Sequence, residues 1–215
     1  SISRTGPMNV TQASGDLSFS AERVGDLNLR ATSGDLILGA IVSGLLDGRA
    51  AQNVSVHDAI NASGPASLTA GTSIALNGGL TAPAVALTAQ NGTISQSAPI
   101  IASSLVTQSA TGTSLTDTGN TIGSVAAANS GSGDITLANS GALNVSGISQ
   151  GGSGDVTVTN TGALTISGTV TTTGNITLTA GGNIQEAGSG AIAGASLTTN
   201  SVTGTVLDSG GNAVT

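Results

Sequence analysis

Cysteine, tryptophan and tyrosine do not occur in this sequence of 215 residues, and Phe19 is its single phenylalanine. Without cysteine no disulfide can form, which suits a protein that crosses an oxidising periplasm unfolded, although a cytosolic protein can also lack cysteine. The hydrophobic residues, 38% of the chain, are almost all Ala, Val, Ile and Leu. Together with 33 glycines, they predict a repetitive fold with a narrow and uniform interior.

Charge is scarce as well. Lysine is absent, all four basic residues (Arg4, Arg23, Arg30 and Arg49) lie in the first fifty positions, and the net charge is −7. Nucleic acid and anionic membrane surfaces are therefore excluded as expected partners, because both require clustered basic residues. No run of eighteen apolar residues occurs, so no membrane insertion is expected. The first residues do not resemble a signal peptide, and we expect a mature chain or a fragment.

A repeat is visible in the second half of the chain. The segment 132–137 (SGDITL) recurs at 153–158 (SGDVTV) and 173–178 (TGNITL), at spacings of 21 and 20 residues. A second element recurs at the same spacings, at 141–145, 162–166 and 182–184, and a weaker third one follows at 167–170 and 190–192. The repeat predicts an all-β parallel solenoid with about 20 residues and three short strands per coil.

Each element joins a turn to a strand. Glycine provides the tight backbone of a corner, and the Asp or Asn beside it is expected to bond the backbone of its own turn. The alternation that follows places Ile135 inward and Thr136 outward. Ile135 should then stack on Val156 and Ile176 in the next coils, with Thr136, Thr157 and Thr177 stacked outside.

Earlier segments follow the same pattern less strictly. Gly-Asp-Leu occurs at 15–17, 25–27 and 34–36, about half a coil apart. The repeats are clearest at 132–194 and least regular at 40–61, a segment that could hold a protruding loop or a helical turn, and at 97–128. We expect one solenoid over residues 1–215, of about eleven coils and about 50 Å. The unpaired strand edges at the two ends of the solenoid would need to be covered. We therefore expect the solenoid to continue, either through further residues of the chain or through another subunit.

The repeated G-[DN]-[ILV]-x-[LV] elements at Gly133, Gly154 and Gly174 resemble those of filamentous-haemagglutinin-like large exoproteins of Gram-negative bacteria. Autotransporter passengers carry similar repeats. The resemblance implies a right-handed parallel β-helix, secreted to the bacterial cell surface, that acts in adhesion, biofilm cohesion or display of a distal domain. Its partners would be host or bacterial surfaces, or extracellular matrix and polysaccharide.

Residues capable of catalysis are few. His57 and Asp58 would form a triad with a serine such as Ser55, but a surface turn is the expected role. A polysaccharide-acting β-helix enzyme of the pectate-lyase type would need a basic residue, and none follows Arg49. We predict no catalytic site, no enzyme activity and no cofactor.

Metal binding is considered at two places. Asp134 and Asp155 should stack one coil apart and either recruit a cation or form a hydrated turn ladder, which we favour. Residues 151–155 resemble a calcium-binding nonapeptide but lack its spacing. No metal site is predicted.

The function predicted from the sequence is a structural or adhesive rod segment. A self-assembling filament subunit, possible through end-to-end association, is the alternative. An ice-binding solenoid is a third hypothesis, because Thr157 and Thr159 should stack on Thr177 and Thr179 in flat ranks.

Overall fold

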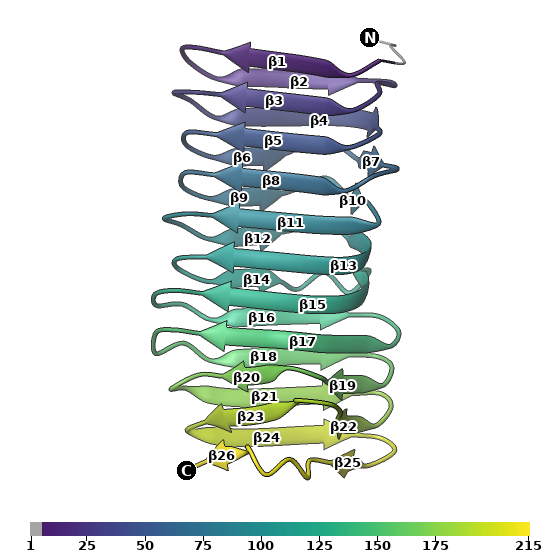
Figure 1. Ribbon diagram of the computed structural model, residues 1–215, viewed down its shortest axis with the longest axis vertical. Coiled ribbons are helices and arrows are strands. Elements are labelled where there is room, and N and C mark those ends of the chain that lie inside the picture. The colour runs from purple at the N-terminus through teal and green to yellow at the C-terminus, as the bar shows by residue number, and fades with distance from the viewer. Residues whose placement is uncertain (1–5) are drawn as a thin grey trace.

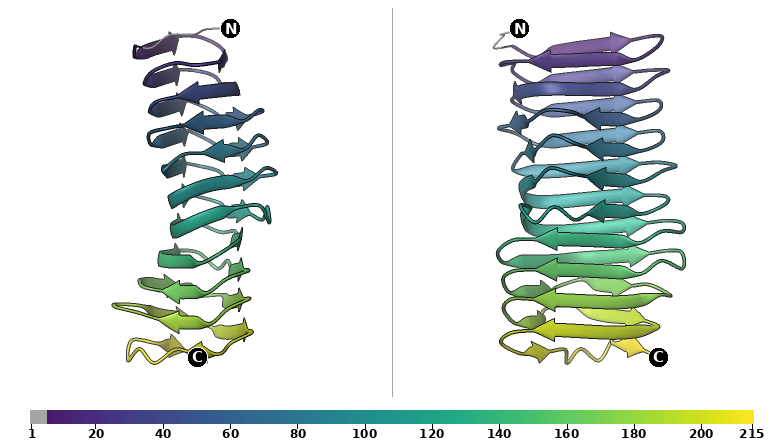
Figure 2. Two further views of the ribbon diagram at one scale, coloured as in Figure 1. Left: turned by 90° about the vertical axis from the view of Figure 1, so that its right-hand side faces the viewer. Right: turned by 180° about the vertical axis from the view of Figure 1, so that it is seen from behind.

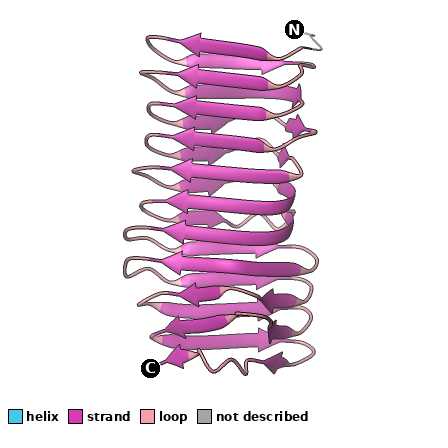
Figure 3. Cartoon of the chain, in the orientation of Figure 1, coloured by secondary structure: helices cyan, strands magenta, loops and turns pink. Residues whose placement is uncertain are grey.

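A computed structural model describes residues 6–215, which form a single parallel β-solenoid of about ten turns. Among these residues there are 26 strands and no helix, and every pairing between strands is parallel (Figures 1 and 3). The strands β1 and β26 lie at opposite ends of the rod (Figure 1). In Figure 1 the front strands run leftward and the rear strands rightward as the chain descends from the N-terminus, so the winding is right-handed. The fold predicted from the repeat is confirmed.

Each coil contributes strands to stacked faces. Face 1 contains β1 (Met8–Gln12), β3 (Leu27–Ala31), β5 (Leu46–Ala50), β8 (Ala66–Ala70), β11 (Ala84–Ala89), most of β13 (Ile100–Ser109) and β15 (Thr121–Asn129), then β17 (Leu143–Gln150), β20 (Thr169–Thr171), β23 (Ala191–Gly194) and β26 (Ala213–Val214).

Face 2 lies behind face 1 in the view of Figure 1 and is seen from the other side in Figure 2. It contains β2 (Leu17–Ala21), β4 (Leu36–Ser43), β6 (Val54–Val56), β9 (Ile74–Leu76), β12 (Ile94–Gln96), β14 (Thr113–Leu115), β16 (Ile135–Asn139), β18 (Val156–Asn160), β21 (Asn175–Ala180) and β24 (Ser196–Ser201).

A shorter face 3 closes the first coils. It consists of the end of β4, β7 (Ile60–Ala62), β10 (Leu80–Thr81) and the first residues of β13 and β15. After β15 the arrangement changes, and β17 pairs separately with β19 (Leu164–Ile166) and β20; β19 is followed by β22 (Ile184–Glu186) and β25 (Thr205–Val206).

The core is a set of aliphatic columns that run along the axis. Ile135 pairs with Val156 and Val156 with Ile176, and all three side chains are buried. The intervening Thr136 and Thr157 point outward on the same strands. The predicted inward and outward register is therefore confirmed, since a period of two places alternate side chains on opposite sides of a strand.

Residues 40–61 contain only short turns between strands, so the possibility of a protruding loop or a helical turn there was wrong. They complete β4 and form β5, β6 and the start of β7, in register with the coils on either side. The reason is burial: Leu46, Val54, Val56 and Ile60 all enter the core, which fixes the strand register even where the glycine signals are weak.

Residues 97–128 coincide with a change of cross-section. The strands of face 2 lengthen from three residues in β14 to five in β16. The interior here is partly polar, because Asn120, Asn129 and Asn139 are at most 2% exposed. The Asn129 side chain accepts a hydrogen bond from the Gly112 N–H and also donates one to the carbonyl oxygen of Gly133. Backbone groups at these corners are thus satisfied by a buried side chain.

Residues 6–215 contain no helix that is long and apolar enough to cross a membrane.

Candidate functional surfaces

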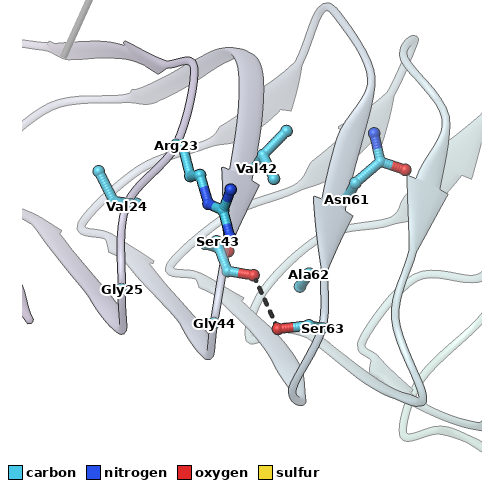
Figure 4. A pocket seen from close by; sticks show the side chains of 9 residues that line it. All are labelled: Arg23, Val24, Gly25, Val42, Ser43, Gly44, Asn61, Ala62 and Ser63. Atoms are coloured by element: carbon cyan, nitrogen blue, oxygen red, sulfur yellow. Dashed lines mark hydrogen bonds between the residues drawn. The ribbon is translucent and has the colours of Figure 1, made fainter. Parts of the chain in front are cut away.

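An open trough lies at the corner where face 3 turns into face 1. Its first part has a volume of about 580 Å³ and is lined by residues 23–25, 42–44 and 61–63 of three successive coils (Figure 4). The same corner is hollow again at 81–83, 101–103, 121–123 and 140–142. Small residues line much of it, and Gly44 is required by close packing, because a Cβ there would lie 2.6 Å from the Oδ1 of Asp26.

Exposed apolar side chains alternate with polar ones along the outer wall of the trough. Val42 is 43% and Ile101 46% exposed, while Arg23, Asn61 and Thr81 occupy the equivalent positions in other coils. The wall therefore has no single chemical character.

The Ser55, His57 and Asp58 side chains are not joined by any hydrogen bond in the part of the chain that the structure describes. Ser55 is on the outer side of β6, while His57 and Asp58 are exposed in the turn that follows. The backbone N–H of His57 donates to the Leu38 carbonyl, as part of the stack. His57 and Asp58 lie in a surface turn, which is the role that the sequence favoured, and Ser55 precedes them on the strand.

The corner aspartates and asparagines bond the next coil, and the expectation that they bond their own turns was wrong. The Oδ1 of Asp16 accepts the Asp35 N–H at 2.9 Å, and the Oδ1 of Asp35 accepts the Asn53 N–H at 2.8 Å. The same pattern joins Asp134 to Asp155 at 2.8 Å and Asp155 to Asn175 at 2.7 Å. We call these two series the Asx ladder. The parallel stack brings the N–H of the next coil within reach of each side chain.

The stacked pair Asp134 and Asp155 is accounted for by this ladder, since one Oδ1 of each residue already accepts a backbone N–H. In residues 6–215, no group of three or more His, Cys, Asp or Glu side chains is placed to hold a metal ion. A cation between the two carboxylates remains a hypothesis.

Hydroxyl groups line the outer side of face 2. One column contains Ser114, Thr136, Thr157, Thr177 and Thr198, in consecutive register. The adjacent column is less regular: Ala138, Thr159, Thr179 and Asn200. Paired threonine ranks are thus two coils deep, as the sequence indicated.

Sequence reasoning missed one arrangement, a pair of stacked arginines on face 1. Arg30 and Arg49 are register partners on β3 and β5. Their spacing of 19 residues, close to one coil, was the available signal. The Nε of Arg49 lies 3.2 Å from the Oδ1 of Asp47, and the Arg30 guanidinium 4.0 Å from its Oδ2.

The chain matches no protein-family model, no curated protein and no solved structure.

Proposed function

We propose that this chain is a rod segment of a secreted bacterial surface protein, with a structural and adhesive role and without catalysis. The observation that carries the proposal is the continuous stack of parallel strands from β1 to β26. Each coil is bonded to the next through its strands, the Asx ladder adds bonds at two places, and no long loop interrupts the strands within residues 6–215. Such a body is an unbranched rod whose coils stay stacked through the change of cross-section at 97–128, which suits a spacer.

Repetition also suits adhesion. One outward column of face 1, from Thr11 to Gln108, and one of face 2, from Ser114 to Thr198, present polar side chains at successive coils, about 4.8 Å apart. A polymer that lies along the axis would meet several weak contacts at once, and many weak contacts give high avidity. The resemblance of the repeats to large exoproteins supports extracellular surfaces or matrix polysaccharides as partners.

The test is adhesion of beads coated with the purified chain to bacterial cells, host cells and immobilised matrix. Beads coated with a Val156→Asp variant serve as the control, because this variant keeps the composition but disrupts the stack. We expect saturable adhesion of the unmodified chain only. Equal adhesion of both kinds of bead, or of neither, would contradict an adhesive role.

A self-assembling filament subunit is the second candidate, favoured by the exposed edge of the last described coil. The strands β24, β25 and β26 pair on one side only. Val202 is 78% and Val206 59% exposed there. A second copy of the chain, or further coils of the same polypeptide, would cover this edge. Electron microscopy over a concentration series distinguishes the filament, which predicts fibres with a fixed axial repeat.

A further inference from the structure

Two like charges face each other on the outer side of face 1. Arg30 and Arg49 are directly paired on neighbouring strands, and their side chains are 50% and 52% exposed. Neighbouring strands lie about 4.8 Å apart, and like charges at that distance destabilise a sheet. The arrangement therefore costs stability unless an anion lies against it.

Asp47 offsets only part of this repulsion. Its carboxylate accepts the Nε–H of Arg49, with distances of 3.2 and 3.3 Å to the two oxygens. The nearest nitrogen of Arg30 is 4.0 Å away, which is an ion pair but not a hydrogen bond. Within residues 6–215 these two guanidinium groups share one carboxylate, so the cluster keeps a net charge of about +1.

Donor groups on both arginines are left for a ligand. The Arg30 side chain donates no hydrogen bond in the described part of the chain, and Arg49 uses only its Nε. The terminal nitrogens of a guanidinium bind a carboxylate with two parallel hydrogen bonds. Asp47 already shows that a carboxylate is accepted beside this pair.

The surroundings define what kind of molecule would carry that carboxylate. The column above and below the arginines is uncharged and polar: Thr11 precedes Arg30, and Thr69, Thr88 and Gln108 follow Arg49. A chain with many negative charges would be repelled by a protein of net charge −7. A polymer of sugar rings with few carboxylates would instead meet hydroxyl and amide groups at each coil.

We propose that Arg30 and Arg49 bind a carboxylate of a sparsely charged acidic polysaccharide that lies along face 1. This inference rests on the adhesive function proposed above and names the chemical class of its ligand. Arg30 and Arg49 bind the carboxylate, and Thr69 and Thr88 contact the neighbouring sugars.

The test uses a fluorescent hyaluronan octasaccharide, which carries one carboxylate per disaccharide, and the same octasaccharide with its carboxyl groups reduced to alcohols. Binding is followed by polarisation with the unmodified chain and with Arg30→Gln, Arg49→Gln, the double variant and Arg23→Gln. Arg23→Gln is the matched control, because it changes the net charge equally but lies at the trough. Thermal unfolding establishes that each variant is folded.

We expect each single variant of the pair to bind about tenfold more weakly, from the loss of a charge-assisted hydrogen bond. Arg23→Gln should bind as the unmodified chain does, and the reduced octasaccharide should bind no better than the double variant binds the acidic one. The inference would be overturned if the double variant bound the acidic octasaccharide fully, or if the unmodified chain bound the reduced octasaccharide equally well. It would also be overturned if Arg23→Gln weakened binding as much as the other variants, or if the unmodified chain did not bind. The bead experiment separates this inference from the proposed function. If the coated beads adhere but the octasaccharide gives any of these contrary results, only the inference fails. If the beads do not adhere, the adhesive function fails as well.

Discussion

The backbone N–H of Asp155 donates a hydrogen bond of 2.8 Å to the Oδ1 of Asp134, one coil earlier in the chain. The Oδ1 of Asp155 in turn accepts the backbone and side-chain N–H groups of Asn175, at 2.7 and 3.1 Å. Side chains at the corners therefore form hydrogen bonds between successive coils, in addition to the backbone hydrogen bonds of the paired strands.

Removing one step of the Asx ladder should weaken the stack. Asp155→Ala leaves the Asn175 N–H without this acceptor and should lower the free energy of unfolding by about 1–2 kcal/mol, since the site is partly exposed to water. Asp155→Asn keeps an acceptor and relieves the repulsion from Asp134, so it should cost less than half as much. Urea unfolding of both variants is the measurement. Equal losses would mean that the charge, rather than the acceptor, matters.

Reversing the polarity of the core should be more severe. Val156 is fully buried between Ile135 and Ile176, so Val156→Asp places an unpaired carboxylate in an aliphatic column. We expect a loss of at least about 3 kcal/mol and rapid hydrogen exchange in the adjacent coils. Thr157→Asp is the control, because the neighbouring side chain points outward. An unchanged melting curve for Val156→Asp would contradict the register.

The interior asparagines should act as a coupled unit. The Oδ1 of Asn139 accepts the Ile122 N–H at 2.7 Å, and its Nδ2 donates to the Oδ1 of Asn160 at 3.0 Å. Asn139→Ala leaves a buried N–H unpaired and should cost about 2–3 kcal/mol. A double-mutant cycle with Asn160→Ala should give a total loss smaller than the sum of the two single losses. Strict additivity would show that the two amides act independently.

Two corner glycines separate backbone strain from steric clash. Gly133 and Gly141 have φ angles of 98° and 89°, which side chains rarely adopt. A Cβ on Gly133 would collide with the carbonyl oxygen of Thr111, whereas one on Gly141 would meet nothing within 4 Å. Gly141→Ala should cost about 1 kcal/mol and Gly133→Ala at least twice that. Calorimetric unfolding of both variants is the check, and equal costs would argue against the close contact between coils.

The solenoid fold and the inward side chains followed from the sequence alone. The period of about 20 residues predicted the coils, and the alternation at Ile135, Thr136 and Leu137 predicted which side chains point inward, because both depend only on spacing along the chain. The number of coils is about ten rather than the eleven expected. The segment at 40–61 was misjudged because its corners lack the Gly-Asp signal, although its buried aliphatic residues keep the register.

Contacts between coils were decided by the tertiary structure. Whether Asp134 bonds its own turn or the N–H of Asp155 depends on how closely two coils stack, and no local pattern records that distance. The amides of Asn129 and Asn139 lie inside because the cross-section changes there and leaves backbone groups to satisfy. Arg30 and Arg49 became a pair only when stacking placed residues 19 positions apart on adjacent strands. Spacing along the chain determines which way a side chain points, but only the stack determines what it meets.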